Sequence, residues 1–280
     1  MHEDAEAAAT RLTGRAVTRT RHLSASLTEA ELDGGLVVVV KRGHARDAVA
    51  AEAAGLRWLA EPGVVPVPVV RGGDAHWLVL DRVTAGSPGP AAAEDLGRGL
   101  AALHAAGAPA FGAAPPSAPA EAWIGLAPMS TTTGTAWRAW YAEQRVLPYL
   151  RRAVDDGVLD HTEAAVVERA CAHLPDSAEP PARLHGDLWN GNVLWGTDGR
   201  AWLIDPAAHG GHRETDLAML GLFGCPHLDR LLRAYDEAAP LAEGWAERIG
   251  AHQLFPLLVH TVLFGRSYAG QAIAAARTVR

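Results

Sequence analysis

The chain has 280 residues, of which 49% are hydrophobic, and this is enough to bury one large core or two lobes around a cleft. The formal net charge of −7 argues against a nucleic-acid or anionic-membrane binder, because such binding needs clustered Lys and Arg. The two cysteines, Cys171 and Cys225, lack metal-binding spacing and predict neither a disulfide framework nor a zinc site.

No segment of the sequence is typical of a secreted or membrane protein. The first ten residues are acidic and do not resemble a signal peptide with its basic and apolar parts. The longest apolar stretch, LFPLLVHTVLFG at residues 254–265, is too short to span a bilayer. We therefore expect a cytoplasmic protein, monomer or homodimer, that binds neither nucleic acid nor membrane.

Strand patterns dominate the beginning of the chain. Residues 16–32 alternate well enough for one or two strands, with a turn near Ser24 and Ser26. The run GGLVVVV predicts a buried strand that ends on Lys41. Two further strands are expected at VPVPVV and HWLVLDRV, on either side of the turn RGGD.

One helix is expected among these strands, over residues 46–60, with Asp47 as a candidate N-cap. Its apolar face is expected to comprise Val49, Ala53, Leu56 and Ala60. Glu52 lies on the same helix, so the next helix after the strand of Lys41 carries a carboxylate.

Helical periodicity dominates after residues 84–92, a Gly- and Pro-rich segment that predicts a hinge. The expected helices are 91–106, 135–153, 161–173, 226–238 and 244–268, with a long loop at 107–125 and short strands at VLW and AWLID. The sequence thus predicts an α+β, two-lobed fold. A small β-rich lobe would occupy residues 1–83, the hinge 84–92, and a larger, mainly helical lobe 93–280.

Two residue types are unusually rare. The chain contains a single lysine, Lys41, and only two asparagines, Asn190 and Asn192. Lys and Asn share AT-rich codons, so their scarcity beside abundant Ala, Gly, Pro and Arg indicates a GC-rich coding bias. Where such a bias has removed a residue type almost everywhere, the remaining examples are candidates for positions that no other residue can fill.

His185, Asp187 and Asn192 match the spacing of a kinase catalytic loop, His-x-Asp-x-x-x-x-Asn. In this pattern the Asp accepts the proton of the substrate hydroxyl, and the Asn supplies a neutral oxygen to Mg²⁺. Asp205 follows at the end of the apolar strand WLI, where a second metal-binding Asp is expected. The tripeptide DPA there lacks the Phe and Gly of a movable activation segment.

Lys41 and Glu52 match the ion pair that positions a lysine against the α and β phosphates of ATP. The order of Lys, Glu, hinge, catalytic loop and strand-terminal Asp therefore predicts a kinase that uses ATP and Mg²⁺. Several residues near these motifs have two possible roles. Asn190 fits a turn as well as a functional position, and Trp189 fits packing as well as a ligand contact. His209 and His212 could hold a metal together with Asp205.

A resemblance to the fructosamine kinases, also called ketosamine 3-kinases, runs from about residue 15 to the C-terminus. It is carried by LHGDLWNGNVLW, LIDPAAHGGHRETDLAMLGLFG, AEAAGLRWLA, LVLDRV and HQLFPLLVHTVLFG. The resemblance implies a protein-kinase-like fold and phosphorylation of the sugar O3 in ketosamines of the fructosamine or ribulosamine type. Such adducts are free or attached to glycated protein lysines, and their phosphorylation leads to deglycation.

The resemblance also implies roles for individual residues. Asp187 would be the catalytic base, Asn192 and Asp205 the magnesium ligands, and Lys41 the phosphate contact with Glu52 as its partner. Further implied contacts are Leu80, Asp81 and Arg82 with adenine, Trp189 and His209 with substrate, and Glu214 and Asp216 as braces of the catalytic loop. The family usually has glycines in the nucleotide turn, whereas HLSASLTEA here offers the hydroxyls of Ser24 and Ser26.

Three alternative functions stay open on the sequence alone. A kinase of the aminoglycoside, choline or homoserine type would use the same catalytic residues, although the Trp in the loop disfavours it. A metal-dependent phosphoesterase would take ligands from HGD and GN together with His209 and His212. A pseudokinase that only binds is suggested by the glycine-poor nucleotide turn.

Overall fold

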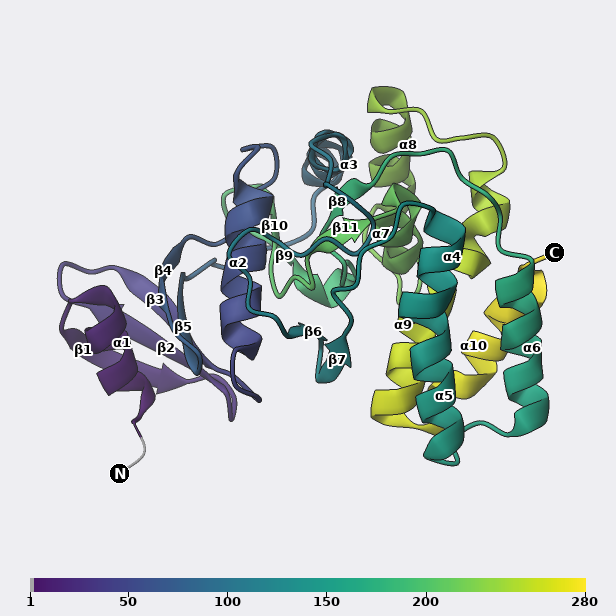
Figure 1. Ribbon diagram of the computed structural model, residues 1–280. Helices are drawn as coiled ribbons and strands as arrows, with labels where there is room; N and C mark the ends of the chain where they lie inside the picture. Colours follow the sequence, from purple (N-terminus) through teal and green to yellow (C-terminus); the bar gives the residue numbers. More distant parts are fainter. Residues whose placement is uncertain (1–2) are drawn as a thin grey trace.

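In the computed structural model, which describes residues 3–280, a five-stranded antiparallel sheet forms an N-terminal lobe (Figure 1). The strands, in the spatial order β1-β2-β3-β5-β4, are β1 (Val17–His22), β2 (Leu27–Leu32), β3 (Val37–Arg42), β4 (Val70–Gly73) and β5 (Trp77–Asp81). The expected strand at residues 65–70 is wrong except at its end, because Pro66 and Pro68 cannot donate to a ladder.

The alternation along β3 decides where Lys41 points. Val38 and Val40 are fully buried on one face of the sheet, where they pack with Ala8 and Ala9 of α1 (Ala5–Thr13). Lys41 belongs to the opposite face, because successive side chains of a strand alternate.

Helix α1 was not predicted from the sequence pattern. Asp4 caps it by accepting a hydrogen bond from the Ala7 N–H.

Helix α2 (Ala48–Ala60) lies where a helix was expected, with Val49, Ala53 and Leu56 buried. Two details of that prediction are wrong. Ala60 is exposed, and Asp47 precedes the helix without a side-chain capping bond. Glu52 is buried on α2 and lines the cavity between the lobes.

The segment expected as a hinge is hydrogen-bonded to the second lobe. The Gly86 N–H donates to the Trp195 carbonyl, and the Thr197 N–H donates to the Thr84 carbonyl. Helix α3 (Pro90–Ala105) begins inside the expected hinge segment, since proline suits the first turn of a helix.

The C-terminal lobe is mainly helical (Figure 1). Its further helices are α4 (Trp137–Tyr141), which continues through the π-helical turn η1 (Ala142–Val146) into α5 (Leu147–Asp155), then α6 (His161–Ala172), α7 (Arg213–Leu220), α8 (Leu228–Ala238), α9 (Trp245–Phe264) and α10 (Arg266–Thr278). The sequence did not predict α7. The single helix expected at 244–268 is two helices, divided at Gly265 with φ 77°.

Short strands carry the loops that reach the cleft. They are β6 (Ala122–Ile124), β7 (Ala127–Met129), β8 (Ala182–Leu184), β9 (Val193–Trp195), β10 (Ala201–Leu203) and β11 (His209–Gly211), with the 3-10 turn η2 (Asn190–Asn192) before β9. Strand β6 lies within the segment expected as a loop at 107–125, and β7 lies just beyond it. The β6–β7 hairpin is located between α2 and the large helical lobe (Figure 1). It therefore brings C-terminal residues to the N-terminal lobe.

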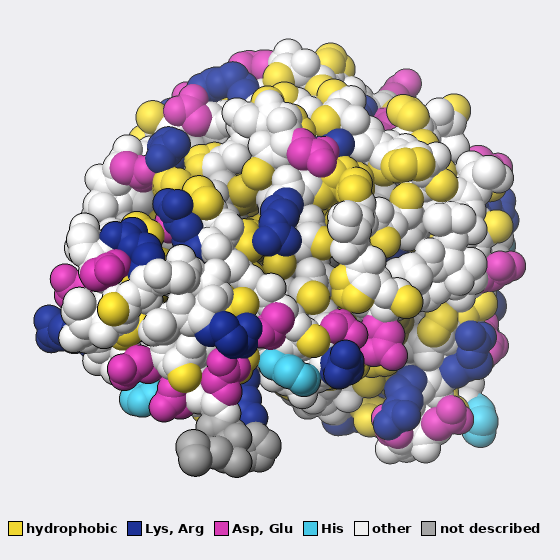
Figure 2. Space-filling model, turned by 60° about the vertical axis from the view of Figure 1, so that its left-hand side comes forward, with side chains coloured by type: hydrophobic (Ala, Val, Ile, Leu, Met, Phe, Trp, Pro, Cys, Tyr) yellow, Lys and Arg dark blue, Asp and Glu magenta, His cyan; other side chains and the backbone are white. Residues whose placement is uncertain are grey.

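Charged side chains of both signs are interspersed over the face of the N-terminal lobe (Figure 2). No helix within residues 3–280 combines the length and the apolarity needed to cross a membrane.

Candidate functional site

The catalytic-loop motif between β8 and η2 is held by Asp216 of α7. Its carboxylate accepts hydrogen bonds from the backbone N–H groups of His185 at 2.8 Å and Gly186 at 2.9 Å. Burial opposes ionisation of Asp216, but the hydrogen bond with His104 and the backbone donors hold its pKa below the usual value. A buried, ionised carboxylate thus fixes the start of the loop, as expected for Asp216.

The loop is packed directly against the segment of Asp205. Gly186 has φ 82°, and a Cβ at this position would collide with the Ala207 carbonyl oxygen. The His185 Nε2–H donates to the Ile204 carbonyl at 2.9 Å. These contacts join the loop of Asp187 to the segment of Asp205.

Asp187 and Asn192 are joined by hydrogen bonds. The Asn192 amide N–H₂ donates to the backbone carbonyl of Asp187 at 2.8 Å and to its Oδ2 at 2.9 Å. Burial raises the pKa of the Asp187 carboxyl to about 7, while the hydrogen bond from Asn192 acts in the opposite direction. Because the amide nitrogen faces Asp187, the amide oxygen of Asn192 is the atom left for a cation.

Lys41 bridges the two lobes through two carboxylates. Its Nζ lies 2.8 Å from Glu52 Oε2 and 3.0 Å from Asp205 Oδ1. Burial raises the pKa of Glu52 to about 7 against the opposing effect of Lys41, whereas the two carboxylates raise the pKa of Lys41 to about 12 against its own burial. Asp205 has φ 51°, a backbone conformation that costs energy and is concentrated at functional sites.

A cavity of about 440 Å³ contains this constellation. The polar residues in its wall are Ser26, Lys41, Arg42, His44, Glu52, Glu121, Asp187, Asn192 and Asp205. The structure therefore brings together the lysine, its glutamate, the catalytic-loop aspartate and both candidate metal ligands from separate segments of the chain.

Of the two serines in the expected nucleotide turn, only Ser26 lines the cavity. Ser26 lines the cavity of Lys41, whereas the Ser24 hydroxyl oxygen accepts the Ser26 N–H at 3.3 Å within the turn itself. The side chains of both serines are exposed.

The stretch expected to contact adenine is largely engaged in the sheet. The Asp81 N–H donates to the Val69 carbonyl and the Arg82 N–H to the Val37 carbonyl. The Asp81 and Arg82 side chains pair with Arg71 and Glu29, and Leu80 is buried. These N–H groups cannot also serve adenine. A separate cavity of about 270 Å³ lies beside them, lined by Val69, Asp81, Arg82, Val83, Thr84, Thr197, Asp198 and Trp202.

Of the two residues expected to contact substrate, Trp189 and His209, only Trp189 lines the cavity. Trp189 lines the 440 Å³ cavity, and its ring lies over Gly191, where a Cβ would collide with it. His209 does not line this cavity. It is 3% exposed on β11, its Nδ1–H donates to the Ala207 carbonyl, and burial lowers its pKa to about 3. His209 is thus a neutral residue packed behind the loop.

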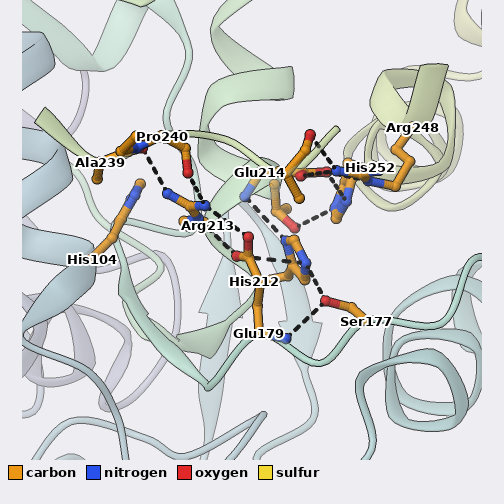
Figure 3. A network of polar contacts seen from close by, with 12 residues as sticks. His104, Ser177, Glu179, His212, Arg213, Glu214, Ala239, Pro240, Arg248 and His252 are labelled. Carbon is orange, nitrogen blue, oxygen red and sulfur yellow. Dashed lines mark hydrogen bonds and ion pairs between the residues drawn. The ribbon is translucent and has the colours of Figure 1, made fainter. Parts of the chain in front are cut away.

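Glu214 does not brace the catalytic loop, contrary to the expectation. Its carboxylate takes two hydrogen bonds from Arg248, at 2.9 and 2.5 Å, and lies 3.2 Å from His252 Nε2 (Figure 3). This network ties α7 to α9. Candidate ligand atoms of His212, Glu214 and His252 lie within 4.8 Å of one another, but the Arg248 guanidinium already neutralises the carboxylate where a cation would bind.

A metal site built from His209, His212 and Asp205 is not formed either. The two histidines are at most 3% exposed inside the C-terminal lobe, whereas the Asp205 side chain is 47% exposed in the cleft. The ligand set required by the phosphoesterase hypothesis is therefore not assembled.

Several cavity residues were missed by sequence reasoning. His44 and Trp123 meet edge to face with centroids 4.9 Å apart, which joins the β3–α2 loop to the β6–β7 hairpin. The only sequence signal for this hairpin was the short WIGL turn inside an Ala- and Pro-rich segment. His104 and Tyr235, whose contacts support Asp216, carried no signal because they lie 112 residues before and 19 residues after it.

The sequence and the structure of the chain were compared with those of known proteins. The fructosamine kinase family model matches residues 5–279. A probable ketoamine kinase of Thermus thermophilus is 38% identical over 223 residues, covering 79% of this chain and 78% of that protein. The crystal structure of a candidate fructosamine-3-kinase from Thermobifida fusca has a TM-score of 0.92 at 49% identity, covering 99% and 98% of the two chains. A macrolide 2'-phosphotransferase from Brachybacterium faecium, at 17% identity, TM-score 0.60 and coverage of 98% and 96%, shares the fold alone.

Proposed function

Because the chain belongs to the fructosamine kinase family, we propose that it transfers the γ-phosphoryl group of ATP to the O3 hydroxyl of a ketosamine. The observation that carries this proposal is the shared cavity of Lys41, Asp187, Asn192 and Asp205. Phosphoryl transfer needs positioning and charge stabilisation more than covalent chemistry, and these four side chains are of the types that provide both.

Asp187 is the proposed base. Its carboxylate, held by Asn192, would accept a hydrogen bond from the acceptor hydroxyl and take its proton as the phosphoryl group arrives. Asp216 acts one step away, by fixing the backbone of His185 and Gly186 so that Asp187 keeps its direction. Lys41, positioned by Glu52, would contact the phosphates of ATP.

Asn192 and Asp205 fit a magnesium ion. Both offer oxygen, the donor that Mg²⁺ prefers, and the amide nitrogen of Asn192 is already used by Asp187. When bound, the metal supplies charge neutralisation to the phosphates. The Lys41 ion pair holds the exposed Asp205 carboxylate toward the same side of the cleft.

We place the adenine beside the segment of Leu80–Arg82, where the 270 Å³ cavity lies. Trp202 lines this cavity, and aromatic side chains stack well on nucleobases. Because the Asp81 and Arg82 N–H groups are engaged, the backbone of Val83 would supply the polar contact. Ser26 would lie over the phosphates in place of the usual glycines.

The biological consequence would be deglycation. A phosphate on O3 destabilises the ketosamine, which breaks down and frees the amine of an amino acid or of a protein lysine. We place this activity in the cytoplasm and leave a monomer and a homodimer as alternatives.

A panel assay tests the proposal. The protein is incubated with Mg-ATP and a fructosamine, a ribulosamine, an erythrulosamine, an aminoglycoside, choline or homoserine, and ADP release is followed. We expect turnover of the ketosamines and little of the other alcohols. Turnover of an aminoglycoside or choline without any ketosamine would replace the proposal by the other small-molecule kinase function, and ATP binding without turnover of any acceptor would favour a pseudokinase.

A further inference from the structure

Arg145 is a charged residue in the interior of the C-terminal lobe that the proposed mechanism does not use. It is 1% exposed, and within residues 3–280 its guanidinium has no carboxylate partner, while Nε and Nη2 make no hydrogen bond. The guanidinium lies instead against aromatic rings, with Cζ 4.6 Å from the ring centroid of Trp140 and 5.6 Å from that of Phe255. Burial lowers the pKa of Arg145 to about 10, so the side chain stays charged at neutral pH. Burying a charge is costly, which indicates a role beyond packing.

The π-helical turn η1 sets the direction in which Arg145 extends. On an α-helix, residues five apart point about 140° away from each other. In a π-helical turn the hydrogen bond spans five residues, as the bond from the Leu147 N–H to the Ala142 carbonyl does here, so residues five apart lie close to one face. Arg145 is thereby stacked on Trp140, and Tyr149 follows one α-helical turn after Arg145 on the same side.

Arg145 and Tyr149 hold the backbone on both sides of Met129, the last residue of β7. The Arg145 Nη1–H donates to the Ser130 carbonyl at 3.0 Å. The Tyr149 hydroxyl donates to the Pro128 carbonyl at 2.7 Å. Because Met129 lines the 440 Å³ cavity, the buried charge of Arg145 acts on the backbone of the cavity wall.

The cavity residues of β6 depend on the same anchor. Ala122 pairs with Met129 in the register of the hairpin, and Trp123 pairs with Pro128. Ala122 and Trp123 both line the 440 Å³ cavity. None of the residues 122–129 lines the 270 Å³ cavity beside which the adenine is proposed to lie. Of the two cavities, the β6–β7 hairpin thus borders only the one that contains the proposed base.

On the basis of the proposed function, we propose that Arg145 is a positioning residue for the sugar acceptor. Through the Ser130 carbonyl it fixes the wall against which the acceptor lies, and Tyr149 is the second anchor of that wall. A cation serves this purpose because a hydrogen bond from a charged donor is stronger than one from a neutral donor. Arg145 touches no reacting group, so its loss should weaken acceptor binding and leave ATP binding unchanged. A purely structural role predicts lost stability without this difference between the two substrates.

Arg145→Met and Tyr149→Phe test this role with a ketosamine as acceptor. The KM for the ketosamine is measured at saturating Mg-ATP, and the KM for ATP at saturating ketosamine. We expect the ketosamine KM to rise about 10-fold in Arg145→Met and about 3-fold in Tyr149→Phe, with the KM for ATP within about 2-fold of the wild type. Tyr149→Phe removes a single hydroxyl and keeps the test decisive if Arg145→Met does not fold.

Tyr141→Phe is the matched control, because it removes a hydroxyl from the same continuous helix. The hydroxyl of Tyr141 contacts backbone groups of α9, namely the carbonyls of Ala251 and His252 and the N–H of Phe255. Urea unfolding should therefore show that Tyr141→Phe loses at least as much stability as Tyr149→Phe. Both KM values of Tyr141→Phe should equal those of the wild type, so a change confined to Tyr149→Phe reports the position of the hairpin and not stability.

Hydrogen exchange of the backbone amides of residues 122–129 measures the anchor without any substrate. Exchange should be faster in Arg145→Met and Tyr149→Phe and unchanged in Tyr141→Phe. Unchanged exchange, an unchanged ketosamine KM, or equal increases of both KM values in Arg145→Met and Tyr149→Phe would overturn the positioning role and keep the kinase function. Failure of the wild type to turn over any ketosamine would overturn the proposed function and the acceptor role with it.

Discussion

Lys41 in the N-terminal lobe and Asp205 in the C-terminal lobe form an ion pair with 3.0 Å between Nζ and Oδ1. The only lysine of the chain thus joins the lobes at the candidate reaction centre, with buried Glu52 as its second partner. The two residues that hold the sides of the cleft together are therefore the same residues that are proposed to bind ATP and metal.

Lys41→Met is expected to affect stability and activity separately. Loss of the ammonium leaves the Glu52 carboxyl, which is 8% exposed, without its partner and should lower the free energy of unfolding by about 2 kcal/mol. Turnover of Mg-ATP should fall about 100-fold. Urea unfolding and ADP release measure the two effects.

The double variant Lys41→Met/Glu52→Gln is the control for this pair. It removes the unpaired acid and should regain most of the lost stability without regaining activity. Recovery of turnover in the double variant would contradict the role of Lys41 in phosphate contact.

Gly186→Ala is expected to abolish turnover because its Cβ would displace the Ala207 carbonyl and with it the segment of Asp205. The backbone conformation alone costs about 1 kcal/mol for alanine. Gly35→Ala isolates that cost, since Gly35 has φ 80° and no atom within 4 Å of an added Cβ. Comparable losses of kcat in the two variants would show that the contact with Ala207 is unimportant.

Acid stability should depend on Glu214. Burial disfavours the Glu214 carboxylate, but hydrogen bonds with Arg248 and His252 outweigh this and lower its pKa to about 2, against 4.5 in an unfolded chain. A depressed pKa stabilises the fold above pH 4.5, and this contribution is lost as the pH falls toward 2. The difference corresponds to about 3 kcal/mol.

Urea unfolding of the wild type and Glu214→Gln at pH 6, 4 and 3 measures this contribution. The wild type should be more stable at pH 6, and the difference between the two proteins should shrink toward pH 3. A difference that is independent of pH would contradict the ionic role of Glu214.

The sequence predicted the parts of the site whose signal is local. The strand before Lys41, the spacing from Asp187 to Asn192 and the position of Asp205 follow from runs of a few residues, and the structure brings all of them to one cavity. Glu214 was misjudged because its neighbour Asp216 does brace the loop, and only the fold shows that Glu214 faces α9 instead.

The elements that the sequence did not predict were missed for physical reasons. Helix α1 has only nine residues, with Leu12 as its one large apolar side chain, and α7 has only eight and is buried except at Arg213, so neither presents a repeated apolar face that the sequence pattern could reveal. The β6–β7 hairpin depends on packing against α2, which no local pattern records. His209 was placed by sequence proximity to Asp205, but its pairing with β8 turns it into the interior.

The most direct test of the account is Asp187→Asn, assayed with Mg-ATP and a ketosamine that the wild type phosphorylates, together with ATP binding measured by calorimetry. Asn keeps the shape of the side chain but cannot accept the proton of the acceptor hydroxyl. We predict a loss of turnover of at least about 100-fold with ATP affinity close to that of the wild type. Turnover equal to that of the wild type would contradict the assignment of Asp187 as the base and, with it, the proposed mechanism.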